Sequence, residues 1–211
     1  MSNLHKNMQI FLLLLCSILS VGFGSYKYLQ FQLSSTDFNN QNIDILKYPS
    51  LVESETLKII AYKELEKSYE KGLSQKNIDL YINRSFSLLK KSIVKTPYSP
   101  IIWSTLGNLE GMVKGHNESV LEYIIMSLKT STYSSDLTTY NLQTALTLVE
   151  HFSSEQKEEI EKTICNSWVH NQTKFKKTFS LANDKKYICL SLKKYCKYEN
   201  KHDVDKYCGT I

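Results

Sequence analysis

Residues 96–110 read Thr-Pro-Tyr-Ser-Pro-Ile-Ile-Trp-Ser-Thr-Leu-Gly-Asn-Leu-Glu, and this stretch in the middle of the chain predicts how the helices pair. Pro97 ends one helical segment, and Trp103, Leu106 and Gly107 open the next with the spacing W-x2-L-G. Trp and Leu side chains fill the space between paired helices, while a Gly lets the neighbouring helix approach closely. We therefore predict that Pro97, Trp103, Leu106 and Gly107 are structural core residues.

Helical periodicity continues on both sides of this stretch, because apolar residues recur at intervals of three and four with Lys and Glu between them. The 211 residues include only 7 Gly and 3 Pro, which are too few turn-forming residues for an all-β protein. Hydrophobic residues make up 42 % of the chain, as in a folded domain. The predicted fold class is all-α. We expect helices over about residues 55–73, 78–94, 99–113, 118–130, 136–151, 155–170, 174–181 and 185–194, and an irregular end over 195–211.

The Pro and W-x2-L-G pattern resembles the junction between two tetratricopeptide repeats, where Pro ends one helical hairpin and Trp-Leu-Gly opens the next. Ser92 stands where such a repeat has a small residue, whereas Glu110 replaces the usual aromatic residue and the unit from Tyr133 lacks the signature. The resemblance implies stacked antiparallel helical hairpins (TPR-like) over residues 55–170. An unrelated helical bundle is the alternative.

The N-terminal segment contains no charged residue between Lys6 and Lys27, and its centre is a run of Ile, Phe and Leu. A helix needs about 20 apolar residues to cross a bilayer, so we predict a transmembrane anchor over 1–28, followed by a polar juxtamembrane linker over 29–54. Cleavage as a signal peptide near Ser20-Val21-Gly22 is the alternative. The first reading predicts a single-pass inner-membrane protein with its body in the periplasm, and the second predicts a secreted protein.

The cysteines agree with export. Cys16 lies in the apolar segment, and the remaining four, an even number near the C-terminus, predict two disulfides in an oxidising compartment: Cys165, Cys189, Cys196 and Cys208. On a continuous helix Cys189 and Cys196 would have Cα atoms about 10.5 Å apart, beyond the roughly 7 Å that a bridge spans. We therefore expect Cys165–Cys189 and Cys196–Cys208, with four reduced, packed thiols as the alternative.

Positive charge gathers at the C-terminus. Residues 172–211 hold ten Lys and four acidic residues and carry +6, whereas the rest of the chain carries −1 of the total +5. We assign residues 171–211 to a basic, Cys-containing cap with a candidate patch for an anionic glycan or lipid headgroups: Lys185, Lys186, Lys193, Lys194 and Lys197. The four Tyr among the Lys form either a sugar-stacking surface or the packing of the cap. Export excludes nucleic acid as a partner, and Lys that serve only solubility are the plain alternative.

The sequence contains no recognised catalytic, nucleotide-binding or metal-binding motif. None of the five His lies in HExxH or beside a recognised nucleophile, and the chain has no GxGxxG, no P-loop and no CxxC. Acidic pairs such as Glu158-Glu159 lie at solvated helix positions. The sequence therefore predicts a protein that is not an enzyme and has neither a cofactor nor a metal site.

A second, looser resemblance covers about residues 85–170. The order of features along the chain is similar to that in membrane-anchored repeat-like proteins of bacterial exopolysaccharide biosynthesis systems. These features are an N-terminal membrane helix, Ser99-Pro100 with Trp103, the run 127–133, Phe152-Ser153 and a helix ending at Trp168. This resemblance implies an accessory or scaffold role through contacts with protein partners of a polysaccharide-assembly complex. A secreted module that binds an anionic glycan through its basic Lys/Tyr-rich C-terminus is the alternative.

Overall fold

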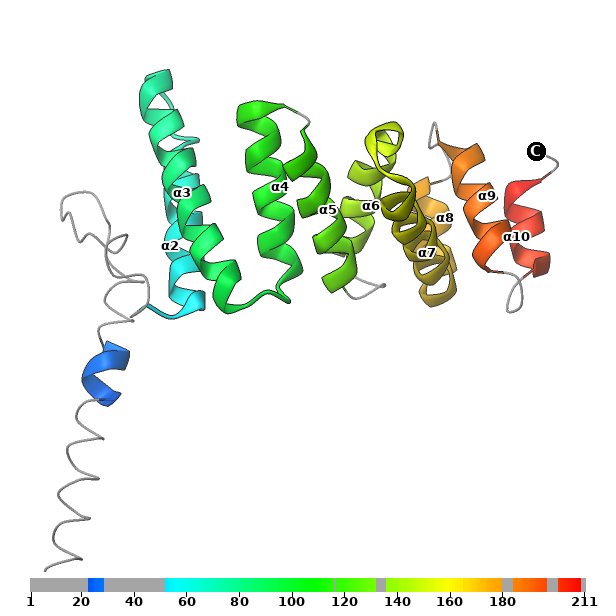
Figure 1. The fold of residues 1–211 in the computed structure, drawn as a ribbon, viewed down its shortest axis with the longest axis horizontal. Coiled ribbons are helices and arrows are strands. Elements are labelled where there is room, and N and C mark those ends of the chain that lie inside the picture. Colours follow the sequence, from blue (N-terminus) through cyan, green and yellow to red (C-terminus); the bar gives the residue numbers. More distant parts are fainter. Residues whose placement is uncertain are drawn as a thin grey trace, which may run out of the picture. The chain divides into compact units, whose positions relative to one another are not determined.

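The computed structural model describes residues 23–28, 52–115, 117–131, 136–179, 184–196 and 201–209. Every regular element within these ranges is a helix, as Figure 1 shows, which agrees with the predicted all-α class. Residues 23–28 are helical, but the rest of the predicted anchor and most of the predicted linker lie outside the described residues. No helix in the described ranges has both the length and the apolar composition required to cross a membrane.

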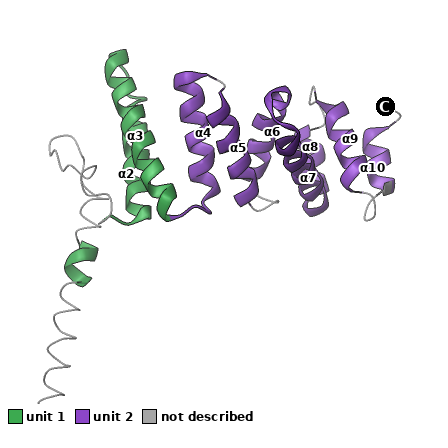
Figure 2. Ribbon diagram, viewed as in Figure 1, with its two compact units in different colours: residues 1–95 green, residues 96–211 purple. Residues whose placement is uncertain are grey.

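The chain divides into two compact units, residues 1–95 and 96–211 (Figure 2). This division falls inside the predicted repeat domain and joins the predicted cap to residues 96–170. Unit 1 contains α2 (Ser54–Lys67) and α3 (Gln75–Lys95). Unit 2 contains α4 (Pro100–Lys114), α5 (Glu118–Thr130), α6 (Asp136–Thr147), the 3-10 turn η2 (Val149–His151), α7 (Ser154–His170), α8 (Gln172–Phe179), α9 (Lys185–Tyr195) and α10 (Lys201–Cys208).

Helices α2 and α3 form an antiparallel hairpin in unit 1. Ser54 Oγ lies 2.8 Å from Ser92 Oγ, and Arg84 Nη1 lies 3.7 Å from Glu64 Oε2. The contacts therefore move backward along α3 as they move forward along α2. Ser92 and Ser85 are fully buried, and these small side chains allow the two helix backbones to pack closely.

Helices α4 and α5 form a second antiparallel hairpin. The hydroxyl of Ser127, near the end of α5, donates a hydrogen bond to the carbonyl of Pro100 at the start of α4, over 2.8 Å. Further along α4, a Cβ placed on Gly107 would lie 3.4 Å from Tyr123 Cβ, in the middle of α5. Gly115, with φ of +69°, ends α4 in the left-handed region that glycine adopts without strain and reverses the chain toward α5.

A buried polar cluster joins α6 to this hairpin. Ser104 Oγ donates to Asn141 Oδ1 over 2.7 Å, and Asn141 Nδ2 donates to Ser127 Oγ over 2.5 Å. All three residues are buried. Because each member has a partner, the cluster avoids the desolvation cost of an unpaired polar group and fixes the register of three helices.

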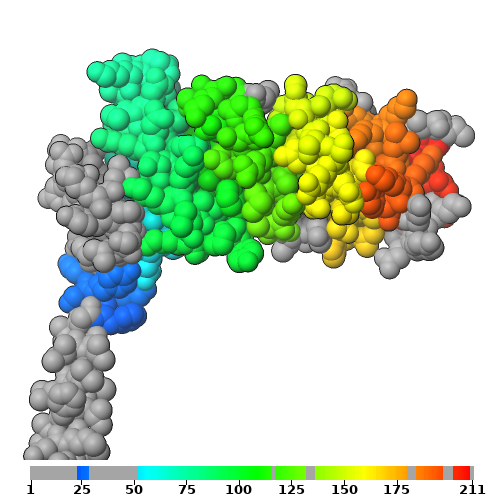
Figure 3. Space-filling model, viewed as in Figure 1, coloured from blue at the N-terminus to red at the C-terminus, as the bar shows by residue number. Residues whose placement is uncertain are grey.

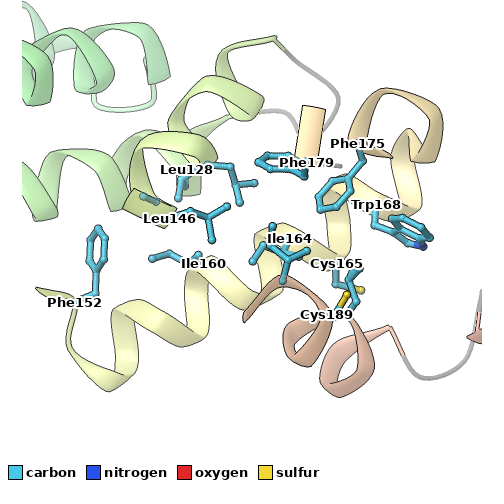
Figure 4. Close-up of a cluster of buried hydrophobic side chains, with 14 of the residues drawn as sticks. Leu128, Leu146, Phe152, Ile160, Ile164, Cys165, Trp168, Phe175, Phe179 and Cys189 are labelled. Atoms are coloured by element: carbon cyan, nitrogen blue, oxygen red, sulfur yellow. The ribbon is translucent and has the colours of Figure 1, made fainter. Parts of the chain in front are cut away.

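An apolar core of unit 2 lies among helices α5 to α10, as Figure 4 shows for part of it. Aliphatic side chains and Phe152 lie at the end near α5 to α7, and an aromatic cluster lies at the end near α8 and α10. Trp168 is fully buried, its ring meets Phe175 edge-on at 5.6 Å between centroids, and it lies 5.1 Å from Tyr207. This tryptophan, which the sequence analysis did not select, is the central aromatic residue of the core.

Two disulfides hold the C-terminal helices, with a pairing that differs from the prediction. Cys165 is bonded to Cys196, and Cys189 is bonded to Cys208. The predicted pairs Cys165–Cys189 and Cys196–Cys208 are therefore wrong, although all four cysteines form disulfides. The bridges join α9 to α7 on one side and to α10 on the other.

The physical reason is the direction of α9. Tyr187 Oη lies 3.4 Å from the carbonyl oxygen of Lys157, Lys194 Nζ lies 2.7 Å from Glu161 Oε2, and Cys196 is bonded to Cys165. Residue numbers rise together along the two helices, so α7 and α9 are parallel. Because α9 runs parallel to α7, its end, and not its start, lies beside Cys165.

The C-terminal segment is also more regular than predicted. Residues 201–208 form α10, whereas the sequence analysis expected an irregular end. Val204 and Cys208 are buried and Tyr207 packs against the core, so one face of this short helix is apolar. An eight-residue helix is unstable alone, and the Cys189–Cys208 bridge together with this packing holds it in place.

Candidate functional site

An open groove of about 880 Å³ lies on unit 2 beside α5 and the segment that contains η2 and the start of α7. Its lining comes from two stretches that are separated in sequence by α6. One face of α5 contributes Asn117, Glu118, Leu121, Glu122, Ile125, Met126 and Lys129, and the other stretch contributes His151, Phe152, Ser153, Glu155 and Gln156.

Capping interactions fix both walls of the groove. Asn117 Oδ1 accepts a hydrogen bond from the backbone N–H of Val120 at the start of α5, over 3.1 Å. At the start of α7, Ser153 Oγ accepts from the N–H of Gln156, and Gln156 Oε1 accepts from the N–H of Ser153. This reciprocal capping box satisfies two backbone donors that would otherwise lack partners. The predicted helix start at 153–156 has this geometry.

The floor of the groove is apolar. Leu121 and Ile125 lie one helical turn apart on α5 and are buried, and Phe152 is 4 % exposed between η2 and α7. Met126 lies beside them and is partly exposed. A flexible thioether next to branched and aromatic side chains provides an adaptable surface for an apolar group.

The rim of the groove is acidic. Glu118 and Glu122 lie one turn apart on α5, and Glu155 lies in the first turn of α7; all three are exposed. None of these carboxylates forms an ion pair with a residue in the described part of the chain. Lys129 is the one cation among the lining side chains, apart from the titratable His151. The groove therefore combines an apolar floor with carboxylates that are available to a cationic partner.

The four described lysines of the predicted anionic-partner patch point in different directions. Lys185 lies over the Tyr207 ring at 5.5 Å from its centroid, and Lys194 pairs with Glu161 at 2.7 Å. Lys186 and Lys193 are exposed on the outer face of α9. Lys197 lies outside the described residues. Within the described part of the chain, the predicted patch therefore reduces to two outward-facing lysines.

The tyrosines of the cap contribute to packing. Tyr187, Tyr195 and Tyr207 are partly buried against the apolar core, and Tyr198 lies outside the described residues. Burial, together with the nearby Glu161 carboxylate, raises the pKa of Tyr187 to about 12. Of the two roles considered from sequence, packing of a disulfide-bonded cap fits these three positions better than a sugar-stacking surface.

The residues of the W-x2-L-G stretch lie at the α4–α5 interface. Leu106 is fully buried and Gly107 is buried against α5. Trp103 is half-buried; its ring stacks on Tyr123 at 5.9 Å, and its Nε1–H donates to the carbonyl of Pro97 over 2.7 Å. Pro97 itself is exposed and does not lie in the core, where the sequence analysis placed it. The Pro and Trp of the motif therefore meet through a hydrogen bond at the start of the hairpin.

Comparison with protein-family models, curated proteins and solved structures finds no match to this chain. The functional argument consequently rests on the geometry of the molecule. The sequence analysis did not predict the groove. The i, i+4 pairs of Glu and of apolar residues on α5 were visible in the sequence, but the opposite wall is brought there only by the packing of α5 against α7.

Proposed function

We propose that this protein is an extracytoplasmic helical scaffold that binds another polypeptide in the groove beside α5 and α7. The observation that carries the proposal is the combination of an apolar floor, at Leu121, Ile125 and Phe152, with a rim of unpaired, exposed carboxylates. Recognition of an amphipathic segment in a helical groove uses apolar anchors for affinity and flanking charges for orientation. A peptide with an apolar anchor between basic residues fits this chemistry.

The location outside the cytoplasm is supported by the two disulfides, because such bonds persist in oxidising compartments. We further propose that the N-terminal apolar segment anchors the chain in the inner membrane, and that the hairpins α2/α3 and α4/α5 are TPR-like units. The resemblances in sequence suggest an accessory role in polysaccharide biosynthesis or export. The contribution of this protein there is to hold a partner in the groove beside α5 and α7.

Site-specific photo-crosslinking of the full chain in its native cells tests the groove. A photoreactive residue at Met126, inside the groove, should give defined crosslinks to a polypeptide, and E118K/E122K should weaken them at least about tenfold, since loss of close charge pairs costs more than about 1.4 kcal/mol. The matched control is Val169, a 41 % exposed apolar residue of α7 outside the groove. Identical products from positions 126 and 169 would overturn the proposal.

Binding of an anionic glycan is the second candidate, and its support is the positive charge of the C-terminal cap. An anionic glycan needs cations clustered on one surface, whereas Lys185 lies over the Tyr207 ring and Lys194 pairs with Glu161. The groove therefore supports a polypeptide partner better than the cap supports a sugar polymer. Retention of the full chain on an anionic polysaccharide column, lost in K186E/K193E and kept in E118K/E122K, would reverse this preference.

A further inference from the structure

Helix α9 presents an outward stripe that no other described element covers. Lys186, Leu190 and Lys193 are spaced i, i+4 and i+7, and all three are exposed; Leu190 has 57 % of its surface accessible. The opposite face of α9, which holds Ile188 and Leu192, is buried in the core, and Cys189, which is also buried and lies beside the stripe, is bridged to Cys208 of α10. Part of α9 (orange) reaches the surface on the face shown in Figure 3. We call Lys186, Leu190 and Lys193 the α9 stripe.

The α9 stripe is the chemical complement of the groove. It has one apolar side chain between two cations, and the groove has an apolar floor between Glu118 and Glu122 on one wall and Glu155 on the other. The two lysines are two helical turns apart, about 10.5 Å along the axis, so they can reach carboxylates on both sides while Leu190 enters between them. None of these lysines or glutamates forms an ion pair with a residue in the described ranges.

The stripe of one molecule cannot enter the groove of the same molecule. Helix α9 is joined to α7 by Cys165–Cys196 and to α10 by Cys189–Cys208. These bonds fix the position of α9, with Ile188 and Leu192 in the core and the stripe exposed. The complementary surfaces can therefore meet only between two molecules.

We propose that the occupant of the groove is the α9 stripe of a second copy of this chain. The inference rests on the proposed function, because it names the polypeptide that the groove binds. The contact is heterologous: each bound copy leaves one free groove and one free stripe, so repetition produces a head-to-tail array. Contacts of this kind bury little surface and are weak individually. Exposed charges at the rim make the association sensitive to salt.

A charge-exchange experiment tests this directly. In E118K/E122K the α5 wall of the groove and the stripe are both basic, and in K186E/K193E both are acidic. Each variant alone should therefore lose self-association. An equimolar mixture pairs the native groove of K186E/K193E with the native stripe of E118K/E122K, so it should regain association. The full chain is prepared in detergent micelles, and its mass is measured by light scattering at protein concentrations up to about 100 µM, where weak interfaces become populated.

Matched controls change the same net charge on unit 1. Glu66 and Glu70, and likewise Lys71 and Lys76, are exposed and far in sequence from both surfaces. The variants E66K/E70K and K71E/K76E should associate as the native chain does, and about 0.5 M salt should dissociate all associating samples because it shortens the screening length to a few ångströms. Equal loss of association in the control variants would show a general charge effect and would overturn the proposal.

The outcome also separates this inference from the proposed function. A mixture of the two charge variants that stays monomeric overturns self-assembly. If crosslinks from position 126 to a different polypeptide persist in that case, the groove still binds a partner and only the identity of the occupant is wrong. Loss of binding to vesicles of anionic lipid in K186E/K193E, with no self-association in the native chain, would overturn the proposal and assign the stripe to the membrane surface.

Discussion

The α4–α5 hairpin and the C-terminal region α7–α10 reach a stable helical packing in opposite ways. Helices α4 and α5 have 15 and 13 residues and pack closely through small side chains and one buried polar cluster. Helices α8 and α10 have 8 residues each and are rich in lysine. They are held by the aromatic cluster around Trp168, and the Cys189–Cys208 bridge fixes α10.

This difference follows from how much apolar surface a helix of given length provides. A helix of four turns offers a continuous stripe that a partner helix can cover, whereas a helix of two turns offers two or three apolar side chains. The short helices therefore gain stability from large aromatic side chains and from covalent links that reduce the entropy of the unfolded chain. Four predictions test this contrast, from the largest expected effect to the smallest.

Removal of both disulfides should destabilise the C-terminal helices and leave the α4–α5 hairpin folded. The bridges close segments of 31 and 19 residues, so each contributes about 3–4 kcal/mol on the chain-entropy estimate. In the variant with all four cysteines changed to Ser, hydrogen exchange should accelerate in α9 and α10 far more than in α4 and α5. Single-bridge variants provide the control. Uniform acceleration across unit 2 would contradict the contrast.

The two tryptophans should differ in their contribution to stability. Trp168 is fully buried, so W168A should lower the free energy of unfolding by about 3–5 kcal/mol. Trp103 is half-buried, so W103A should cost about 1–2 kcal/mol through loss of the ring stack and one hydrogen bond. Urea denaturation measures both values.

Phenylalanine at each position sharpens this test. Trp168 Nε1 has no hydrogen-bond partner among the described residues, so W168F removes ring volume and no described hydrogen bond. W103F removes the donor to the Pro97 carbonyl. A larger loss of stability in W103A than in W168A would show that the hairpin, and not the C-terminal core, depends on its tryptophan.

The buried polar cluster should contribute measurably to the free energy of unfolding, although it contains only a few side chains. N141A removes the partner of the Ser104 hydroxyl and one partner of the Ser127 hydroxyl. Leaving buried polar groups unpaired costs about 1–3 kcal/mol, and thermal unfolding should report this loss. Gln143 is an exposed amide on the same helix, so Q143A should stay within about 0.5 kcal/mol of the native chain. Equal losses of stability in N141A and Q143A would show that the cluster does not hold α4, α5 and α6 together.

The smallest of the four expected effects is that of alkaline pH, which should weaken the contact between α7 and α9. Burial, with the Glu161 carboxylate, raises the pKa of Tyr187 to about 12 from its ordinary value of 10.0. The folded state thus favours the neutral phenol. The resulting contribution to the stability of the fold is complete below pH 10.0 and is lost as the pH rises toward about 12. The ion pair with Glu161 also raises the pKa of Lys194, which acts in the same direction. Y187F should reduce the slope of stability against pH, and an unchanged slope would exclude Tyr187 as its origin.

The sequence by itself determined the positions of most helices, because their signals are local, although α2 ends at Lys67 and not near residue 73 as predicted. Helix α5 spans the predicted residues 118–130, and the predicted Ser cap near 153–156 is a complete capping box. The even number of cysteines near the C-terminus also predicted two disulfides. Helix α10 was missed because its apolar side chains, Val204, Tyr207 and Cys208, are few and stand among charged residues.

The tertiary structure alone decided the relations between segments that are distant in the chain. Which cysteines meet depends on the direction of α9 relative to α7. The four described lysines of the predicted patch separate because α9 turns Lys185 toward Tyr207, Lys194 toward Glu161, and Lys186 and Lys193 outward. The groove exists because packing against α7 brings Phe152 and Glu155 beside α5. Spacing along a helix fixes which side chains share a face, whereas the surface that each face meets is set by how the chain reverses and packs.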